Sequence, residues 1–275
     1  MKALTNKCFY LKTVREFIII MILFFIPFIQ LLSQNKNDFK IFNALLYKNT
    51  PDLRNYGFSK INMIYEDGVI STNYKFKKGD YNWRYIDFTK IMKEARKTEI
   101  KKIPVCLDVE YWGKYLYNKT TKSNAEDIYE NLINMYRVID SKSLISVFHY
   151  GAISERIYNA SNVVYPCYYT HSTNRNEWIS MVKNGINKIK KRNKNLPIYA
   201  FIWPQYNPDH SKHDLGYSFI EPDFWKLQLE TLYPLCDGIV IWSHYKDENG
   251  DVVYFNENMP WFQETIKFIE KYDIK

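Results

Sequence analysis

The sequence predicts an α/β protein, a distorted (β/α) TIM-like barrel of about seven to eight parallel strands with an N-terminal hydrophobic segment. Short apolar runs of strand length alternate with amphipathic stretches of helical length along most of the chain. Several runs are apolar throughout, as expected for parallel strands that are buried on both faces. About seven such strand–helix units in roughly 240 residues are close to the size of this barrel.

A doubly wound parallel sheet is the alternative fold. That fold carries a glycine-rich phosphate-binding turn between its first strand and helix, and no such turn follows any predicted strand. The whole chain holds only 9 Gly. The sequence therefore favours the barrel.

Residues 1–34 are predicted to be a signal peptide or a membrane anchor, and residues 35–275 the barrel catalytic domain. An apolar run at 17–32 (FIIIMILFFIPFIQLL) follows a short basic stretch. The run is longer than the roughly 7–15 residues of a signal-peptide core and shorter than the roughly 20 of a spanning helix. We expect the protein to be secreted or membrane-anchored outside the cytoplasm, with residues 17–32 as the membrane tether in the second case.

The charge of the chain excludes nucleic acid as the expected partner. Four cations and one carboxylate before residue 17 account for +3 of the formal net charge of +8, which leaves +5 for all that follows. Such a small excess over that length does not predict a nucleic-acid surface.

The first half of the barrel is predicted from three apolar runs. Lys40–Tyr47 and Lys60–Tyr65 have strand length, and Asp67–Gly79 has the pattern of a β-hairpin that decorates the barrel after the second strand. Tyr85–Thr98 is amphipathic and predicts a helix, and Ile103–Val109 is the third strand.

The next unit begins with the helix Ala125–Ile139, in which Ile128, Leu132 and Met135 repeat at helical spacing. Ser123 is its expected N-cap. The remaining strands and helices follow the same alternation. They are the strands Leu144–Tyr150, Val163–Tyr169, Pro197–Trp203 and Gly238–Trp242, and the helices Glu177–Arg192, Pro222–Leu235 and Trp261–Tyr272.

Aromatic and acidic side chains recur where the predicted strands end. In a (β/α) barrel this end carries the active site, because the βα loops converge there. Aromatic faces pack on sugar rings and polar tips bind hydroxyls, so the pattern predicts a carbohydrate cleft, although single aromatic residues at strand ends also serve as packing. The residues are Tyr47, Tyr65, Glu66, Asp67, Asp108, Glu110, Trp112, His149, Tyr150, Tyr168, Tyr169, His171, Trp203, Gln205, Tyr206, Trp242 and His244.

Asp108 and Glu110 are the predicted catalytic pair. Side chains two apart on a strand point to the same side, so both carboxyl groups would face the barrel mouth while Val109 faces the helices. Two carboxyl groups that close cannot both ionise easily, and the one that keeps its proton can act as a general acid for glycosidic cleavage. A buried strand rarely holds two acids that have no function.

The segment LDVEYW (Leu107–Trp112) resembles the Asp-x-Glu-x-Trp strand end of the family 56 glycoside hydrolases, the hyaluronidases of venoms and animals. Similar segments follow in the same order. They are SVFHYGAI (Ser146–Ile153), YPCYY (Tyr165–Tyr169), LPIYAFIW (Leu196–Trp203) and CDGIVIWSH (Cys236–His244). The segment after Trp112 is much shorter than in those enzymes, and the three cysteines after residue 35 do not match their disulfide framework.

This resemblance implies a retaining, substrate-assisted endo-β-N-acetylhexosaminidase, in which the 2-acetamido oxygen of the substrate attacks the anomeric carbon. Glu110 would be the acid and then the base, and Asp108 would orient the acetamido N–H. Tyr169 would bind the acetamido carbonyl, and Trp242 would form the wall of its pocket. The strand ends add Tyr47, Trp112, Tyr150 and Trp203 as substrate-binding residues.

Two other functions stay open at this point. One is a membrane-tethered glycan-binding barrel without catalysis, and the other is a barrel glycosidase that uses Glu66 or Asp67 on sugars without an acetamido group. No cofactor and no metal are predicted. The spacing His210-x-x-His213 lies in a polar loop, and Cys106, Cys167 and Cys236 are expected to be unreactive thiols.

Overall fold

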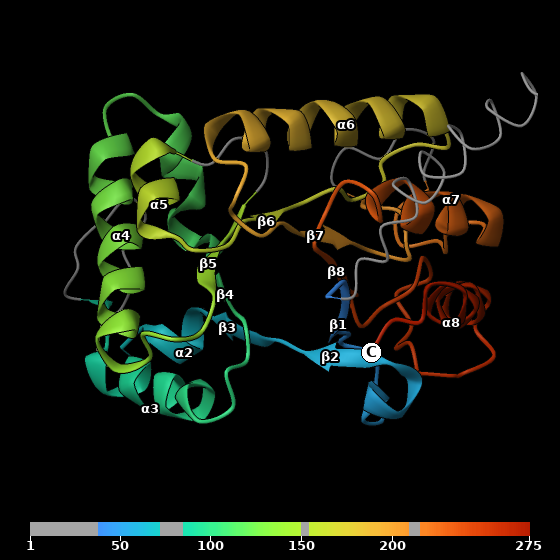
Figure 1. Ribbon diagram of the computed structural model, residues 1–275, viewed down its shortest axis with the longest axis horizontal. Coiled ribbons are helices and arrows are strands. Elements are labelled where there is room, and N and C mark those ends of the chain that lie inside the picture. The colour runs from blue at the N-terminus through green and yellow to red at the C-terminus, as the bar shows by residue number, and fades with distance from the viewer. Residues whose placement is uncertain (1–37, 72–84, 150–153, 209–214) are drawn as a thin grey trace, which may run out of the picture. The chain divides into compact units, whose positions relative to one another are not determined.

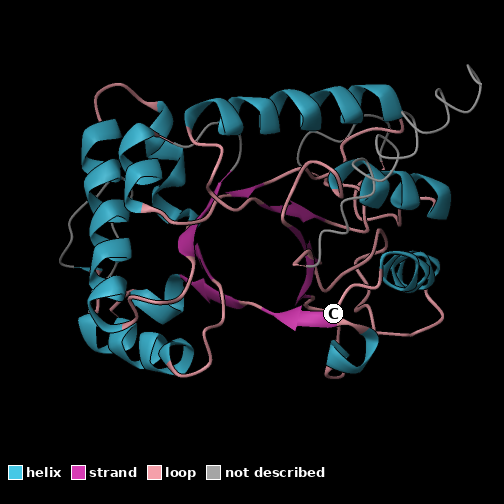
Figure 2. Ribbon diagram, viewed as in Figure 1, coloured by secondary structure: helices cyan, strands magenta, loops and turns pink. Residues whose placement is uncertain are grey.

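The computed structural model describes residues 38–71, 85–149, 154–208 and 215–275. In this part of the chain, parallel strands form a ring and helices surround it (Figures 1 and 2). The strands are β1 (Lys40–Ala44), β2 (Phe58–Lys60), β3 (Asn62–Tyr65), β4 (Val105–Asp108), β5 (Ile145–His149), β6 (Tyr165–Pro166), β7 (Tyr199–Ile202) and β8 (Gly238–Trp242).

The α-helices of the described part are α2 (Glu66–Val69), α3 (Phe88–Glu99), α4 (Lys122–Ile139), α5 (Glu155–Ala160), α6 (Arg175–Arg192), α7 (Pro222–Leu232) and α8 (Pro260–Tyr272). Two 3-10 helices, η1 (Leu53–Tyr56) and η3 (Glu110–Tyr117), add to them.

The ring consists of two parallel sheets with the strand orders β2-β1-β8-β7 and β3-β4-β5-β6. On one side the sheets are linked by parallel bridges from Val164 to Ile198 and from Cys167 to Phe201. On the other side Ile61 alone separates β2 from β3. The predicted α/β barrel with parallel strands is therefore confirmed.

The predicted strand Lys60–Tyr65 contains β3, which pairs with β4. The sequence did not indicate β2, which precedes β3, shares only Lys60 with the predicted run and pairs with β1. The other six predicted runs each contain one strand.

Strand alternation separates two cores. One side of each strand faces the helices with aliphatic residues such as Ile41, Leu107 and Ile239. The other side fills the barrel interior, where Phe42, Cys106, Tyr165, Phe201 and Val240 are buried together. Interior positions continue toward the C-terminal ends of the strands, and these positions determine which side chains can reach the barrel mouth.

The hairpin prediction for Asp67–Gly79 is wrong at its start, because α2 occupies Glu66–Val69. The remainder of that prediction falls largely on residues 72–84, which lie outside the described residues. Ser123 is not the N-cap of α4, since the helix already begins at Lys122 and follows Thr121. The short helices α2 and α5 span too few residues for a periodic pattern to be visible in the sequence.

The predicted N-terminal segment, residues 1–34 with the apolar run at 17–32, lies outside the described residues, and the compact unit that the structure describes is Asp38–Lys275. Among the described residues, none of the helices combines the length and the apolar character that crossing a membrane requires. The described cysteines Cys106, Cys167 and Cys236 are free thiols.

Candidate active site

A cavity of about 260 Å³ opens at the C-terminal ends of the strands. Its described lining comes from β3, β4, β5 and β8, and from the segments that follow β3, β4, β6, β7 and β8. The lining residues are Tyr65, Glu66, Asp108, Glu110, Phe148, Tyr169, Trp203, Asn207, Pro208, Tyr217, Trp242 and His244. Carboxylates and aromatic rings therefore meet in one place.

Asp108 and Glu110 line this cavity together, as the sequence predicts, but the geometry behind it differs. β4 ends at Asp108, and Glu110 is the first residue of η3. The two residues therefore do not belong to the same strand, and strand alternation is not what places their side chains on one side. The interior-facing position of Asp108 and the turn into η3 bring them together, while Val109 packs toward the helices as expected.

Asp108 is a carboxylic acid at neutral pH in this cavity. Burial, with the nearby charges of Glu110 and Glu66, raises its pKa to about 8. The side chain is only 8% exposed, and its Oδ1 atom is buried without a hydrogen bond to any described residue. Removal from water disfavours the charged form, and two neighbouring carboxylates disfavour it further.

Glu66 is a third carboxylate at the site, which the sequence offered only as an alternative catalyst. Its Oε1 atom accepts a hydrogen bond from the backbone N–H of Glu110 across 2.9 Å. A 3-10 helix leaves its first N–H groups without partners inside the helix, so Glu66 stabilises the start of η3. The signal for this residue was its position directly after Tyr65 at a strand end.

Aromatic rings form one wall of the cavity. Tyr169 stacks on Trp242 with the ring centroids 5.6 Å apart and an interplanar angle of 22°. Trp203 meets Trp242 edge to face at 4.9 Å, and Tyr217 packs on both Trp203 and His244. Trp242 donates a hydrogen bond from Nε1 to the hydroxyl of Tyr65 across 3.4 Å. Such a packed set holds each ring in a fixed orientation.

Gln205 stabilises this aromatic wall through hydrogen bonds on the side away from the cavity. Its Oε1 atom accepts hydrogen bonds from Nε1 of Trp203 and from the hydroxyl of Tyr47, each 3.0 Å long. Its Nε2 atom donates to the backbone carbonyls of Tyr217 and Lys246. Gln205 is completely buried, so it connects three loops through satisfied polar contacts.

Two predicted substrate-binding residues lie away from the cavity lining. Tyr47 is buried behind the wall, because it follows the side of its run that faces the helices, the side of Phe39 and Ile41. Trp112 is fully buried in the layer between barrel and helices, where it packs edge to face on Tyr129. Their positions are those of supporting residues, in contrast to the direct sugar contacts expected from sequence.

Successive residues at a strand end point to opposite sides of the barrel wall, and the other predicted residues are distributed accordingly. Tyr169, Trp203 and Trp242 line the cavity, while Tyr150 lies outside the described residues. His149 and Tyr168 face a different cavity outside the ring, between α5 and α6. Phe148, Asn207, Pro208 and Tyr217 also line the cavity and were not predicted. Alternation along β5 places Phe148 on the interior side, whereas the other three residues lie in the loop after β7.

The described lining holds three carboxyl groups and no lysine or arginine. His244 adds little positive charge, because burial and the neighbouring Lys246 lower its pKa. Within the residues that the structure describes, no group of three or more His, Cys, Asp or Glu side chains is arranged to hold a metal ion. His210 and His213 lie outside those residues.

The comparisons with known proteins show similarity of fold. No protein-family model matches the chain, and no curated protein matches it. The structure is similar to that of bee venom hyaluronidase in complex with a hyaluronic acid tetramer, with a TM-score of 0.53 and 10% identity over 86% of this chain and 96% of that chain. A monoclinic crystal form of the same enzyme gives a TM-score of 0.53 and 10% identity, again over 86% of this chain and 97% of the other.

At 10% identity, this likeness shows that the chain has the barrel fold of a known glycosidase. The resemblance of the short sequence segments to the family 56 glycoside hydrolases is thus supported at the level of the fold.

Proposed function

We propose that the protein is a glycoside hydrolase that cleaves inside an N-acetylhexosamine-containing glycan, with retention of configuration and with the substrate's acetamido group as nucleophile. The observation that carries this proposal is the meeting of Asp108 and Glu110 in one cavity with a packed aromatic wall. The barrel fold shared with bee venom hyaluronidase, a protein crystallised with a bound hyaluronic acid tetramer, supports a carbohydrate substrate.

Glu110 is the proposed general acid and base. It is the more exposed of the pair and lies at the rim, where a glycosidic oxygen can approach it. Asp108 holds the proton of the pair in the free cavity, and this proton passes to Glu110 when the substrate binds. In the first step the glycosidic oxygen takes it from Glu110 as the bond to the anomeric carbon breaks. The acetamido oxygen forms a bond to that carbon. In the second step water attacks the anomeric carbon as the bond from this carbon to the acetamido oxygen breaks, and the water passes a proton to the Glu110 carboxylate, which restores the acid.

Asp108 is the proposed orienting group for the acetamido N–H. With the proton of the pair on Glu110 in the reacting complex, the carboxylate of Asp108 accepts this hydrogen bond. Positive charge develops on the acetamido group as its oxygen attacks, and a cation beside a carboxyl group lowers the pKa of that group. The developing positive charge therefore favours the carboxylate form of Asp108 when the transition state forms, which is the kind of interaction that accelerates a reaction.

Tyr169, Trp203 and Trp242 supply the platform for the sugar. Their rings are held by one another and by Gln205, so little rotamer freedom is lost when a sugar ring packs on them. Tyr169 and Trp242 are the residues that the family resemblance assigns to the acetamido pocket, and both lie in the cavity lining.

The test compares the wild type with Glu110→Gln, which keeps the shape and removes the acid. We expect release of reducing ends from N-acetylhexosamine oligomers to fall at least about 10²-fold. Glu248→Gln, at an exposed residue of a turn away from the cavity, is the matched control and should retain activity. Unchanged cleavage by Glu110→Gln would contradict the proposal, and a wild type that binds oligomers without cleaving them would indicate a glycan-binding barrel.

A thiazoline mimic of the bicyclic intermediate distinguishes the remaining alternative. A substrate-assisted site binds this mimic tightly, because it resembles the transition state. A barrel glycosidase that acts on sugars without an acetamido group would not be inhibited. Export of the protein stays a prediction from residues 17–32, and N-terminal sequencing of the purified protein would show whether the segment is removed.

A further inference from the structure

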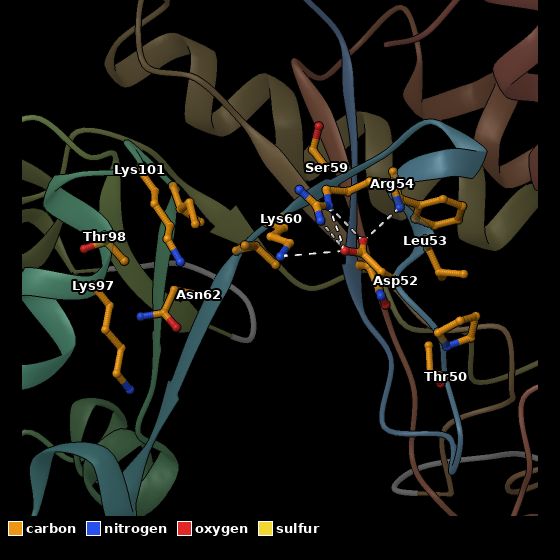
Figure 3. A pocket seen from close by; sticks show the side chains of 15 residues that line it. Thr50, Asp52, Leu53, Arg54, Ser59, Lys60, Asn62, Lys97, Thr98 and Lys101 are labelled. Carbon is orange, nitrogen blue, oxygen red and sulfur yellow. Dashed lines mark hydrogen bonds and ion pairs between the residues drawn. The ribbon is translucent and has the colours of Figure 1, made fainter.

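A groove of about 420 Å³ lies on the outside of the barrel wall, next to β2 and β3. It shares no residue with the cavity at the barrel mouth. Figure 3 shows Lys97 and Lys101 on one side of this groove, and Asp52, Arg54 and Lys60 on the other. We call it the outer groove.

The outer groove exists because the helical layer has a gap there. Most strands of the barrel are followed by an α-helix that packs on the ring, but β1 and β2 are connected through η1, a single turn at Leu53–Tyr56. No α-helix of the described residues lies between β1 and β2 in the chain. The gap lies between η1 and the C-terminal end of α3 (Figure 1).

The strand residues beneath the groove are polar. Asn43, Lys60 and Asn62 occupy outward-facing positions. The corresponding positions of the other strands hold aliphatic residues such as Val105, Leu107 and Ile239, which pack under helices. Burial of Asn or Lys under a helix would require partners for each polar group, so this sequence leaves the wall accessible to water or to a polar ligand.

Positive charge predominates along the groove. Its lining holds four cations, Arg54, Lys60, Lys97 and Lys101, against one carboxylate, Asp52. Arg54 and Asp52 form a close ion pair, and Lys97 pairs with Glu94 just outside the lining. Lys60 lies 3.9 Å from Asp52, and Lys101 forms no ion pair with any described residue. An anion entering the groove therefore meets cations on both sides.

We propose that the outer groove binds a segment of an acidic polysaccharide, whose carboxylate or sulfate groups lie between Lys60 and Lys101. Thr50 and Asn62 add polar side chains to the lining that can bind sugar hydroxyls between the charged groups. This inference goes beyond the proposed function and does not depend on it, because the groove holds no catalytic residue.

The lining argues against the other common polyanion, a nucleic acid strand. Proteins that bind single strands without sequence preference stack the bases on exposed aromatic rings. Among the described lining residues of the groove the one aromatic residue is Phe58, which is 4% exposed and stacks on Phe262 in the core. The groove therefore offers charge and hydrogen bonds but no stacking surface.

The experiment measures binding of a fluorescent heparin-derived decasaccharide to the full chain at about 50 mM salt, where surface charges are screened less than at physiological salt. The background variant is Glu110→Gln, so that cleavage cannot affect the measurement. We expect Lys60→Gln/Lys101→Gln to weaken binding at least about fivefold in this background, and to lower the dependence of binding on salt.

The matched control is Lys190→Gln/Lys191→Gln, which removes the same charge from the exposed basic end of α6. We expect this control to bind within about twofold of its parent. The reverse result, loss of binding in the α6 variant alone, would overturn the proposal, as would equal losses in both. Tighter binding of a single-stranded oligonucleotide of equal charge would also overturn it.

The same variants separate this inference from the proposed function. Lys60→Gln/Lys101→Gln leaves the cavity at the barrel mouth intact, so cleavage of a short neutral oligosaccharide should be unchanged in an otherwise wild-type chain. Failure of decasaccharide binding contradicts the outer groove alone, whereas failure of cleavage by the wild type contradicts the proposed function alone.

Discussion

The carboxylate of Glu66 holds the backbone N–H of Glu110, although the two residues are 44 positions apart in the chain. Both residues follow strands that are neighbours in the ring, β3 and β4. The position of the proposed acid is thus set by a hydrogen bond from the adjacent strand end. The same carboxylate contributes to the raised pKa of Asp108, so Glu66 acts on both members of the pair.

Glu66→Gln and Glu66→Ala separate these two effects. Gln keeps an oxygen that can accept from the N–H of Glu110 and removes the charge, so the pKa of Asp108 falls and the pH at which it titrates moves down. Ala also removes the acceptor, and we expect a further loss of about tenfold in kcat. Profiles of kcat/KM against pH for both variants check this. Identical profiles for Gln, Ala and wild type would show that Glu66 has neither role.

Replacement of Asp108 changes how stability depends on pH. An unfolded Asp titrates near pH 4, whereas the pKa of Asp108 in the folded protein is raised to about 8, first by burial and then by Glu110 and Glu66. The folded state therefore binds the extra proton between these values. The stability that this group contributes is complete below about pH 4 and is lost as the pH rises through about 8.

Asp108→Asn removes this dependence. Between about pH 5 and 7, the free energy of unfolding of the wild type should fall relative to that of the variant as the pH rises. The difference between the two proteins should grow by up to about 1.4 kcal/mol per pH unit. Urea unfolding at three pH values in this range measures the difference. Parallel stability curves for the two proteins would show that Asp108 titrates normally.

Neutral glycans should be better substrates than uronate-bearing ones. Three carboxyl groups and no lysine or arginine occur in the described cavity lining. Two like charges about 8 Å apart repel by about 2 kcal/mol at an effective dielectric constant of about 20. We expect kcat/KM for a neutral N-acetylglucosamine oligomer to exceed that for a hyaluronan oligomer of equal length by at least about tenfold. Equal values, or a preference for hyaluronan, would contradict this expectation.

Tyr47 should affect stability more than substrate binding. Tyr47→Phe removes the hydroxyl that donates to Gln205, while the hydrogen bond from Trp203 to Gln205 stays. We expect a loss of about 1 kcal/mol in the free energy of unfolding and a KM within about twofold of the wild type. Trp203→Leu, at a lining residue, is the comparison and should raise KM at least about tenfold. A larger change in KM for Tyr47→Phe would place Tyr47 in contact with substrate after all.

Part of the site could be predicted because strand alternation depends only on local geometry. Tyr169, Trp203 and Trp242 continue the interior side of their runs, so their side chains reach the cavity as the sequence indicates. Alternation fails for Trp112, because η3 begins at Glu110, whereas Tyr47 continues the side of its run that faces the helices, with Phe39 and Ile41. Where a strand stops depends on the hydrogen bonds of its neighbours, which a single run of sequence does not contain.

The sequence by itself determined the alternating strands and helices, the parallel barrel and the acidic pair at a strand end, because hydrophobic periodicity is a property of consecutive residues. The tertiary structure alone decided that Glu66 would hold Glu110, that Asp108 would keep its proton, and that the gap beside β2 would be lined with cations. Those features depend on distances and burial between residues far apart in the chain, and only the closed ring sets them.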